Sequence, residues 1–343
     1  PQGDNVGKGI LEFAHGKPLG ERGAYWLKIH TANCFAMKLD SGLKTDKVSF
    51  QERIDWVDFH KELIIDSALN PLDGQRFWAS ADDKKPFQAL AACFEMERYW
   101  REGPSMISHL PIQVDGSNNG IQNLAAMGRD EVGGVLVNLL PSEQPEDIYQ
   151  VVCDKVIERV YKDLESEDER TRGFAQGWVG HVTRKIVKRP IMTKAYNVSV
   201  YGMMLQIQEE LRKLKENGTC PFQTDCRMEA LYLAGLIRDC LGSTVSSACS
   251  TMEWLQRASK IVANEGLPVK WVTPVGFPVL QSYTKTQGVR VRCLLGGMQL
   301  SLTVRQGTHE LNLIKMANSI SPNFTHSLDS SHMMLTVNKC LDY

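Results

Sequence analysis

The stretch from Arg184 to Tyr196 constrains the fold and the chemistry of this chain more than any other. Arg184, Lys188, Met192 and Tyr196 follow one another at steps of four, and on a helix this spacing places them along one slowly drifting face. Arg and Lys suit phosphate oxygens, and Tyr offers a flat stacking face with a hydroxyl at its edge. The pattern predicts a helix that binds a nucleoside triphosphate. The alternative is a solvated cationic helix whose Met and Tyr pack inward.

Pro190 lies inside this stripe. Proline has no N–H group, so it removes one hydrogen bond from a helix interior. We therefore expect either a helix that begins near Arg189, with Pro190 in its first turn, or a helix that is kinked at Pro190.

Composition limits the class of protein. A length of 343 residues suggests about two domains, and the net charge of 39 − 40 = −1 means that any basic surface is local. The nine cysteines have no paired metal-ligand spacing, which favours reduced, mostly buried thiols in a reducing compartment. No apolar run is long enough for a membrane span, so we expect no membrane partner. Both ends resemble the interior of a longer protein.

Helical spacing recurs along the chain. It predicts helices from Ser49 onward, over 86–99, over 203–216 before an Asn-Gly stop, and as one or two buried helices over 226–264. Residues 24–30 fit either a strand or a short helix. Lys47 lies just before the helix at Ser49, where a cation can reach a ligand; an ordinary exposed lysine is the alternative.

Asp115 ends a run of alternating apolar residues that starts at Leu110 and leads into a Gly-Ser turn. A carboxylate at the end of a buried strand is a common ligand for a divalent metal. An aspartate that caps the next helix is the alternative.

Two hairpins are predicted near the C-terminal third. Residues 269–280 surround a Pro-Val-Gly turn, and residues 288–302 surround Gly296-Gly297. Arg290 and Arg292 are two apart on one strand, so both point to one face. A two-stranded ribbon fits the major groove of DNA, and Arg is the best reader of guanine. An exposed edge with solubilising charges is the alternative.

The last motif runs from Ser321 to His332. Ser321 as a cap and Pro322 at the first helical position are expected to start a helix. Asp329 and His332 are three apart, so they can orient one another.

Together these motifs resemble the single-subunit, bacteriophage-type DNA-directed RNA polymerases, a family that includes the mitochondrial enzymes. The match to its first catalytic motif lies at 114–117 with 120–122. The match to its second consists of Arg184, Lys188, 192–193 and 195–196. The match to the element before its third lies at 321–324 with His326, Ser327 and Asp329. Further matches at 131–134, 138–143, 271–274 and 276–278 favour the phage branch, and with it the cytoplasm of an infected bacterial host rather than a mitochondrion.

The resemblance implies an activity and residue roles. The activity is template-dependent transfer of ribonucleoside monophosphates from NTPs to the RNA 3′ end by a two-metal mechanism. The implied partners are the DNA template, the promoter and the nascent RNA. The implied roles are Asp115 for one of the two aspartates that hold Mg²⁺, Lys188 for the departing pyrophosphate, Arg184 and Lys47 for the triphosphate, Met192 for the nucleotide, Tyr196 and His332 for the ribose 2′-hydroxyl, and Arg290 and Arg292 for the promoter.

The resemblance also implies an α+β, mainly helical right-hand fold around a small palm sheet. We expect a partial palm at 1–131, fingers at 132–331 with the ribbon at about 268–302, and the start of a returning palm segment at 332–343.

Four departures from the family pattern bear on activity. Asn197 and Ser330 stand where the family has Gly, Asn123 replaces a His, and Pro190 is unusual. The second catalytic aspartate is not among the 343 − 332 = 11 residues after His332. We therefore expect a chain that cannot polymerise alone, because it is a partial gene or one half of a split enzyme whose second polypeptide carries that aspartate. A non-catalytic nucleic-acid-binding remnant is the alternative. A related DNA polymerase is another, against which Tyr196 and His332 argue.

Overall fold

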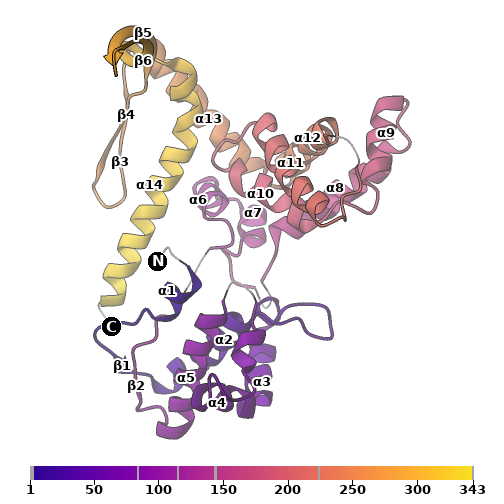
Figure 1. Ribbon diagram of the computed structural model, residues 1–343, viewed down its shortest axis with the longest axis vertical. Helices are drawn as coiled ribbons and strands as arrows, with labels where there is room; N and C mark the ends of the chain where they lie inside the picture. The colour runs from indigo at the N-terminus through magenta and orange to yellow at the C-terminus, as the bar shows by residue number, and fades with distance from the viewer. Residues whose placement is uncertain (1–3, 83–84, 114–115, 143–144, 223–224, 342–343) are drawn as a thin grey trace. The chain divides into compact units, whose positions relative to one another are not determined.

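The computed structural model describes residues 4–82, 85–113, 116–142, 145–222 and 225–341. The chain forms two compact units, one of residues 1–115 with 142–145 and the other of residues 116–141 with 146–343 (Figure 1). Helices dominate both units, and the described strands form three antiparallel pairs. The predicted α+β, mainly helical class is therefore confirmed.

The first unit is a cluster of helices. Its elements are α1 (Asn5–Gly9), β1 (Lys17–Pro18), α2 (Gly20–Phe35), η1 (Thr45–Lys47), α3 (Phe50–Phe59), α4 (Lys61–Leu69), η2 (Phe77–Ser80), α5 (Pro86–Glu102) and β2 (Ile107–Ser108). The predicted helix at Ser49 is confirmed, because Ser49 and Glu52 form a reciprocal capping box at the start of α3. The ambiguous residues 24–30 are helical and lie within α2.

The predicted strand that leads into Asp115 is not present in the described residues. β2 pairs with β1 only at residues 107–108, and residues 109–113 lie outside any strand. Pro111 has no N–H group for a sheet ladder, which explains why the strand stops early. Val114 and Asp115 lie outside the described residues.

The second unit is larger and holds most of the predicted site. Its elements are α6 (Asn119–Gly128), α7 (Glu131–Leu136), α8 (Ile148–Asp163), α9 (Glu169–Trp178), α10 (Arg184–Lys194), α11 (Val200–Glu216), α12 (Arg227–Thr244), α13 (Ser246–Asn264), β3 (Val269–Val272), β4 (Pro278–Gln281), β5 (Thr284–Leu295), β6 (Met298–Leu311) and α14 (Leu313–Leu341).

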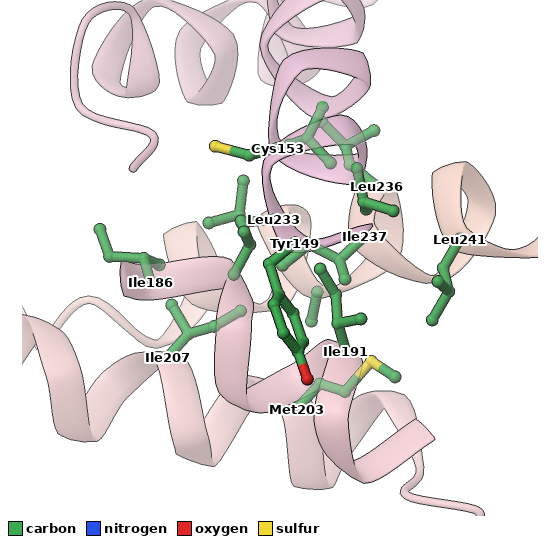
Figure 2. Close-up of a cluster of buried hydrophobic side chains, with 14 of the residues drawn as sticks. Tyr149, Cys153, Ile186, Ile191, Met203, Ile207, Leu233, Leu236, Ile237 and Leu241 are labelled. Carbon is green, nitrogen blue, oxygen red and sulfur yellow. The ribbon is translucent and has the colours of Figure 1, made fainter. Parts of the chain in front are cut away.

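Figure 2 shows the core of this unit, in which side chains from α8, α10, α11 and α12 meet. Ile186 and Ile191 of α10 are almost fully buried there. Burial of these side chains removes apolar surface from water and is the main force that fixes α10 in place.

α10 begins at Arg184 and continues through Pro190 to Lys194. The expectation of a helix start near Arg189 was therefore wrong. Pro190 lies on the buried face of α10 with Ile186, Val187 and Ile191. Apolar packing on that face offsets the hydrogen bond that the proline cannot make.

Both predicted hairpins are confirmed. β3 pairs with β4, and β5 pairs with β6 around Gly296 and Gly297. Both glycines have positive φ, 59° and 81°, as a two-residue type I′ turn requires. The second ribbon is longer than predicted, because its strands run from residue 284 to residue 311.

The prediction that Ser321 caps a helix starting at Pro322 was wrong. α14 begins at Leu313, and the Asn312 side chain accepts a hydrogen bond from the Lys315 N–H at 3.0 Å. Pro322 lies inside the helix and Ser321 is fully buried. Among the described residues, no helix is long and apolar enough to cross a membrane.

Candidate functional site

The exposed face of α10 carries the two cations that the sequence singles out. Arg184 and Lys188 both approach the ring of Tyr149 in α8, with its centroid 5.3 Å from the Arg184 guanidinium carbon and 5.6 Å from the Lys188 Nζ. The Arg184 guanidinium also contacts the Asp147 carboxylate at 2.7 Å. The aromatic ring and the carboxylate therefore hold Arg184 in place, while a guanidinium with five N–H groups retains donors for a further anion.

Tyr149 links this cationic face to the segment that follows Asp115. Its ring is buried, and its hydroxyl donates a hydrogen bond to the Ser117 carbonyl oxygen at 2.8 Å. The Asn138 side chain donates to the Ser117 hydroxyl at 2.6 Å. Ser117 is thus fixed beside the residue against which Arg184 and Lys188 pack.

The C-terminal end of α10 lies against α6 and α14. A Cβ added to Gly120 would overlap the Ala195 Cβ, so α6 approaches the residue after α10 as closely as a glycine permits. The Ser321 hydroxyl donates to the Ala195 carbonyl oxygen at 3.2 Å. Residues from all three predicted motifs therefore meet at one point.

α10 ends at Lys194, so Tyr196 lies in the turn after the helix. The prediction that Tyr196 shares a helical face with Arg184, Lys188 and Met192 was wrong in this respect. The Tyr196 ring lies 4.7 Å from the His326 ring, centroid to centroid. Partial burial raises the pKa of the Tyr196 hydroxyl above its usual value, and the negative charge of Asp329 raises it further. The hydroxyl therefore stays protonated and can donate a hydrogen bond.

Asp329 is the carboxylate of this cluster. It accepts a hydrogen bond from the Asn123 side chain at 2.6 Å. Partial burial raises its pKa, while the charge of His326, the Asn123 hydrogen bond and the charge of His332 act in the opposite direction. The charge of His332 therefore acts on Asp329, while the mutual orientation of the two side chains stays a prediction.

Asn197 has a left-handed backbone, with φ +60°. Glycine adopts this conformation without strain, and asparagine tolerates it better than most residues do. The Asn197 side chain donates to the Asn318 carbonyl oxygen at 3.1 Å and accepts from Gln256 at 2.9 Å. The backbone thus explains why asparagine can replace a family glycine here.

Three predicted site residues are not joined to this cluster by the described contacts. Lys47 belongs to the first unit, where it is half exposed and pairs with Asp46 at 3.3 Å. Met192 is exposed on α10. Asp115, the predicted metal ligand, lies outside the described residues.

A magnesium site in this chain would need several oxygen ligands. Within the described ranges, no three His, Cys, Asp or Glu side chains are grouped so as to hold a metal ion. Asp329, the carboxylate of the cluster, accepts a hydrogen bond from Asn123. The described residues therefore do not form a metal site.

Arg290 and Arg292 lie on β5, opposite Thr303 and Ser301 of β6. Both arginines are exposed and share one face of the ribbon. This arrangement agrees with the predicted direction of their side chains.

The structure adds three residues to the site that the sequence did not indicate as site residues. Asp147 and Tyr149 hold Arg184, and His326 packs on Tyr196. Asp147 also caps α8, so an Asp directly before a buried apolar helical face was a visible signal. The contact of Tyr149 with the cations had no signal in the sequence, because it depends on how α8 packs on α10.

Comparisons with known proteins place this geometry in a family. A family model described as DNA-dependent RNA polymerase matches residues 17–343. The chain is 39% identical over 342 residues to DNA-directed RNA polymerase 2B, chloroplastic/mitochondrial, of Nicotiana tabacum, covering 98% of this chain and 32% of the relative. It is 40% identical over 344 residues to the mitochondrial DNA-directed RNA polymerase of Mus musculus, covering 98% of this chain and 27% of the relative.

The chain therefore spans about a third of the length of the curated relatives it matches. These relatives are organellar enzymes, so the expected phage branch and bacterial host stay predictions. The motifs, their meeting at the end of α10 and the match over most of the chain lead to one conclusion: this chain belongs to the single-subunit, phage-type family of DNA-dependent RNA polymerases.

Proposed function

We propose that this chain supplies the nucleotide-binding part of a template-dependent RNA polymerase, which transfers ribonucleoside monophosphates from NTPs to an RNA 3′ end. One observation carries the proposal. Tyr149, against which Arg184 and Lys188 pack, donates a hydrogen bond to Ser117. Ala195, the residue before Tyr196, contacts both Gly120 and Ser321.

The order of groups along α10 matches the order of groups in a nucleoside triphosphate. Arg184 and Lys188 offer positive charge for phosphate oxygens. Tyr196 lies past the C-terminal end, about 18 Å along the chain from Arg184 at the helical rise. Lys188 would stabilise the charge that develops on the departing pyrophosphate, because a fixed cation favours a group whose negative charge grows.

Tyr196 would select the sugar. Its protonated hydroxyl can donate a hydrogen bond to a ribose 2′-hydroxyl, and the packing of His326 limits where the ring can lie. His332, on the exposed side of α14, would contribute from beside Asp329.

The wider assignments rest on the family resemblance. We propose Mg²⁺ as cofactor, with Asp115 as one ligand. The same resemblance is the basis for three proposed partners, namely the DNA template, the nascent RNA and a promoter bound by Arg290 and Arg292. It is also the basis for a triphosphate contact by Lys47 and for a palm–fingers division at about residue 131.

Two features that favoured an inactive remnant have a structural explanation. Asn197 occupies a left-handed position that asparagine tolerates, and Pro190 is packed on the buried face of α10. Neither residue therefore argues for a lost site, and the polymerase is the better-supported function.

Nucleotide binding to the 343-residue chain tests this proposal. We expect Lys188→Gln to weaken ATP binding by about tenfold in calorimetric titration, because one charge-assisted contact contributes about 1.5 kcal/mol or more. Lys185→Gln is the matched control, since Lys185 lies on the same helix with its side chain directed to Glu210 at 3.8 Å. Equal affinities of the wild type and Lys188→Gln for ATP would contradict the proposal.

Sugar selection separates an RNA polymerase from a DNA polymerase. The wild-type chain should bind ATP more tightly than dATP, and Tyr196→Phe should bring the two affinities together. Tyr201→Phe is the control, because Tyr201 is an exposed tyrosine on α11. A preference for dATP in the wild type would favour the DNA polymerase instead.

A further inference from the structure

The β5–β6 ribbon carries a third arginine on the face of Arg290 and Arg292. Its register places Arg290 opposite Thr303, Arg292 opposite Ser301, and Gly288 opposite Arg305. Directly opposed residues of an antiparallel pair share a face, and so do residues two apart. Arg305 therefore lies in one row with Arg290 and Arg292.

This row is strongly basic although the whole chain is close to neutral. Residues 284–311 contain three Arg and one Lys against one Glu, a balance of 4 − 1 = +3. The single glutamate, Glu310, pairs with Lys285 at 2.8 Å. In the part of the ribbon that the structure describes, the positive charge of the arginine row is thus not cancelled by an acidic neighbour. A local positive field of this kind attracts polyanions.

Arg305 differs from the other two arginines in its position along the ribbon. Gly288, the residue directly opposite Arg305, has no side chain. This glycine is four residues from Arg292 along β5. Four residues span about 13 Å along a strand. The major groove is about 12 Å wide, so a ribbon that places Arg292 at the base edges places Arg305 near the groove rim.

We propose that Arg305 is a further DNA contact of this polymerase segment and that it binds a backbone phosphate, whereas Arg290 and Arg292 face the bases. The inference rests on the proposed function, because it takes duplex DNA as the partner of the ribbon. A phosphate contact is independent of base sequence, and it releases a counterion from the DNA.

The test is salt-dependent binding of the 343-residue chain to two fluorescein-labelled 30-base-pair duplexes of unrelated sequence, measured by anisotropy. Arg305→Gln should weaken binding to both duplexes by the same factor. It should also reduce the slope of log affinity against log salt by about 0.9. Between about 50 mM and about 200 mM KCl, the ratio of wild-type to variant affinity should therefore shrink about threefold.

Lys285→Gln is the matched control, because it removes the same charge from the same ribbon at a residue already paired with Glu310. It should leave the slope near the wild-type value. Circular dichroism of each variant should show the helical content of the wild type, since Arg305 is exposed.

A wild-type slope in Arg305→Gln would overturn the inference. A loss of affinity for only one of the two duplexes would also overturn it, because it would indicate base reading instead of phosphate binding. A wild-type chain that binds neither duplex would overturn the ribbon as a DNA contact. Failure of the proposed function itself would appear in the separate ATP titration at α10.

Discussion

α10 and the β5–β6 ribbon have the same amphipathic design but differ in what covers the apolar face. Each carries cations on one face, Arg184 and Lys188 on α10 and the arginine row on the ribbon. The apolar face of α10 is buried in the core of Figure 2. The opposite face of the ribbon has Val291, Leu302 and Val304 with about half of each side chain exposed, at 43%, 52% and 50%.

The difference shows which part of the site the chain positions by itself. The cations of α10 are held in place by a core from four helices and by Tyr149. The ribbon has two strands, and two-stranded ribbons gain little stability from their own pairing. The proposed nucleotide site is therefore preorganised, whereas the proposed DNA contact would set the orientation of the arginine row.

The largest expected effect comes from breaking the core behind α10. Ile191→Ala should lower the free energy of unfolding of the second unit by about 2–5 kcal/mol, because it removes a fully buried side chain and leaves a cavity. Urea denaturation followed by tryptophan fluorescence measures the change. A loss below about 1 kcal/mol would mean that this core does not hold α10.

Gly120→Ala should cost about 1–3 kcal/mol, because the new methyl group overlaps Ala195 and must displace α6 or the turn that carries Tyr196. The same variant should also bind ATP and dATP with more similar affinities than the wild type does. Gly235→Ala is the control, since a Cβ there meets nothing within 4 Å and helical Ala is favoured over Gly. A Gly120→Ala protein as stable as Gly235→Ala would show that α6 does not press against α10.

Asp329→Asn should change how stability depends on pH. The folded protein raises the pKa of Asp329, so the native state binds this proton more tightly than the unfolded state does, and stability falls as pH rises through the range just above the usual Asp value. The variant lacks this cost, so its Tm should rise relative to that of the wild type as the pH rises above the usual Asp pKa. Asp168→Asn should show the opposite trend, because hydrogen bonds from Thr171 lower the pKa of Asp168.

The smallest effect is expected on the ribbon. Leu302→Ala should change the free energy of unfolding by less than about 0.5 kcal/mol, because half of the side chain is already exposed. The same urea experiment as for Ile191→Ala gives a direct comparison of the two faces. A cost near that of Ile191→Ala would mean that the apolar face of the ribbon is covered in solution.

Sequence patterns predicted most helices and both hairpins correctly, and the reason is local. Helical spacing at 86–99 and 203–216 reflects which face of each helix is buried, and Gly296-Gly297 supplies the positive φ that its turn requires. The error at proline concerns Pro322, which local rules place at a helix start. Pro322 lies inside a longer helix, and Pro190 lies inside α10, where the sequence left a helix start and a kinked helix open.

The sequence by itself determined the family, the amphipathic face of α10 and the shared face of Arg290 and Arg292, because each of these depends on residue types at fixed spacing. Tertiary structure alone decided that Tyr149 lies against both cations, that Asn123 binds Asp329 across 206 residues, and that Arg305 joins the arginine row. Such contacts depend on how separate elements pack and on strand register, and neither follows from the period of a single helix or strand.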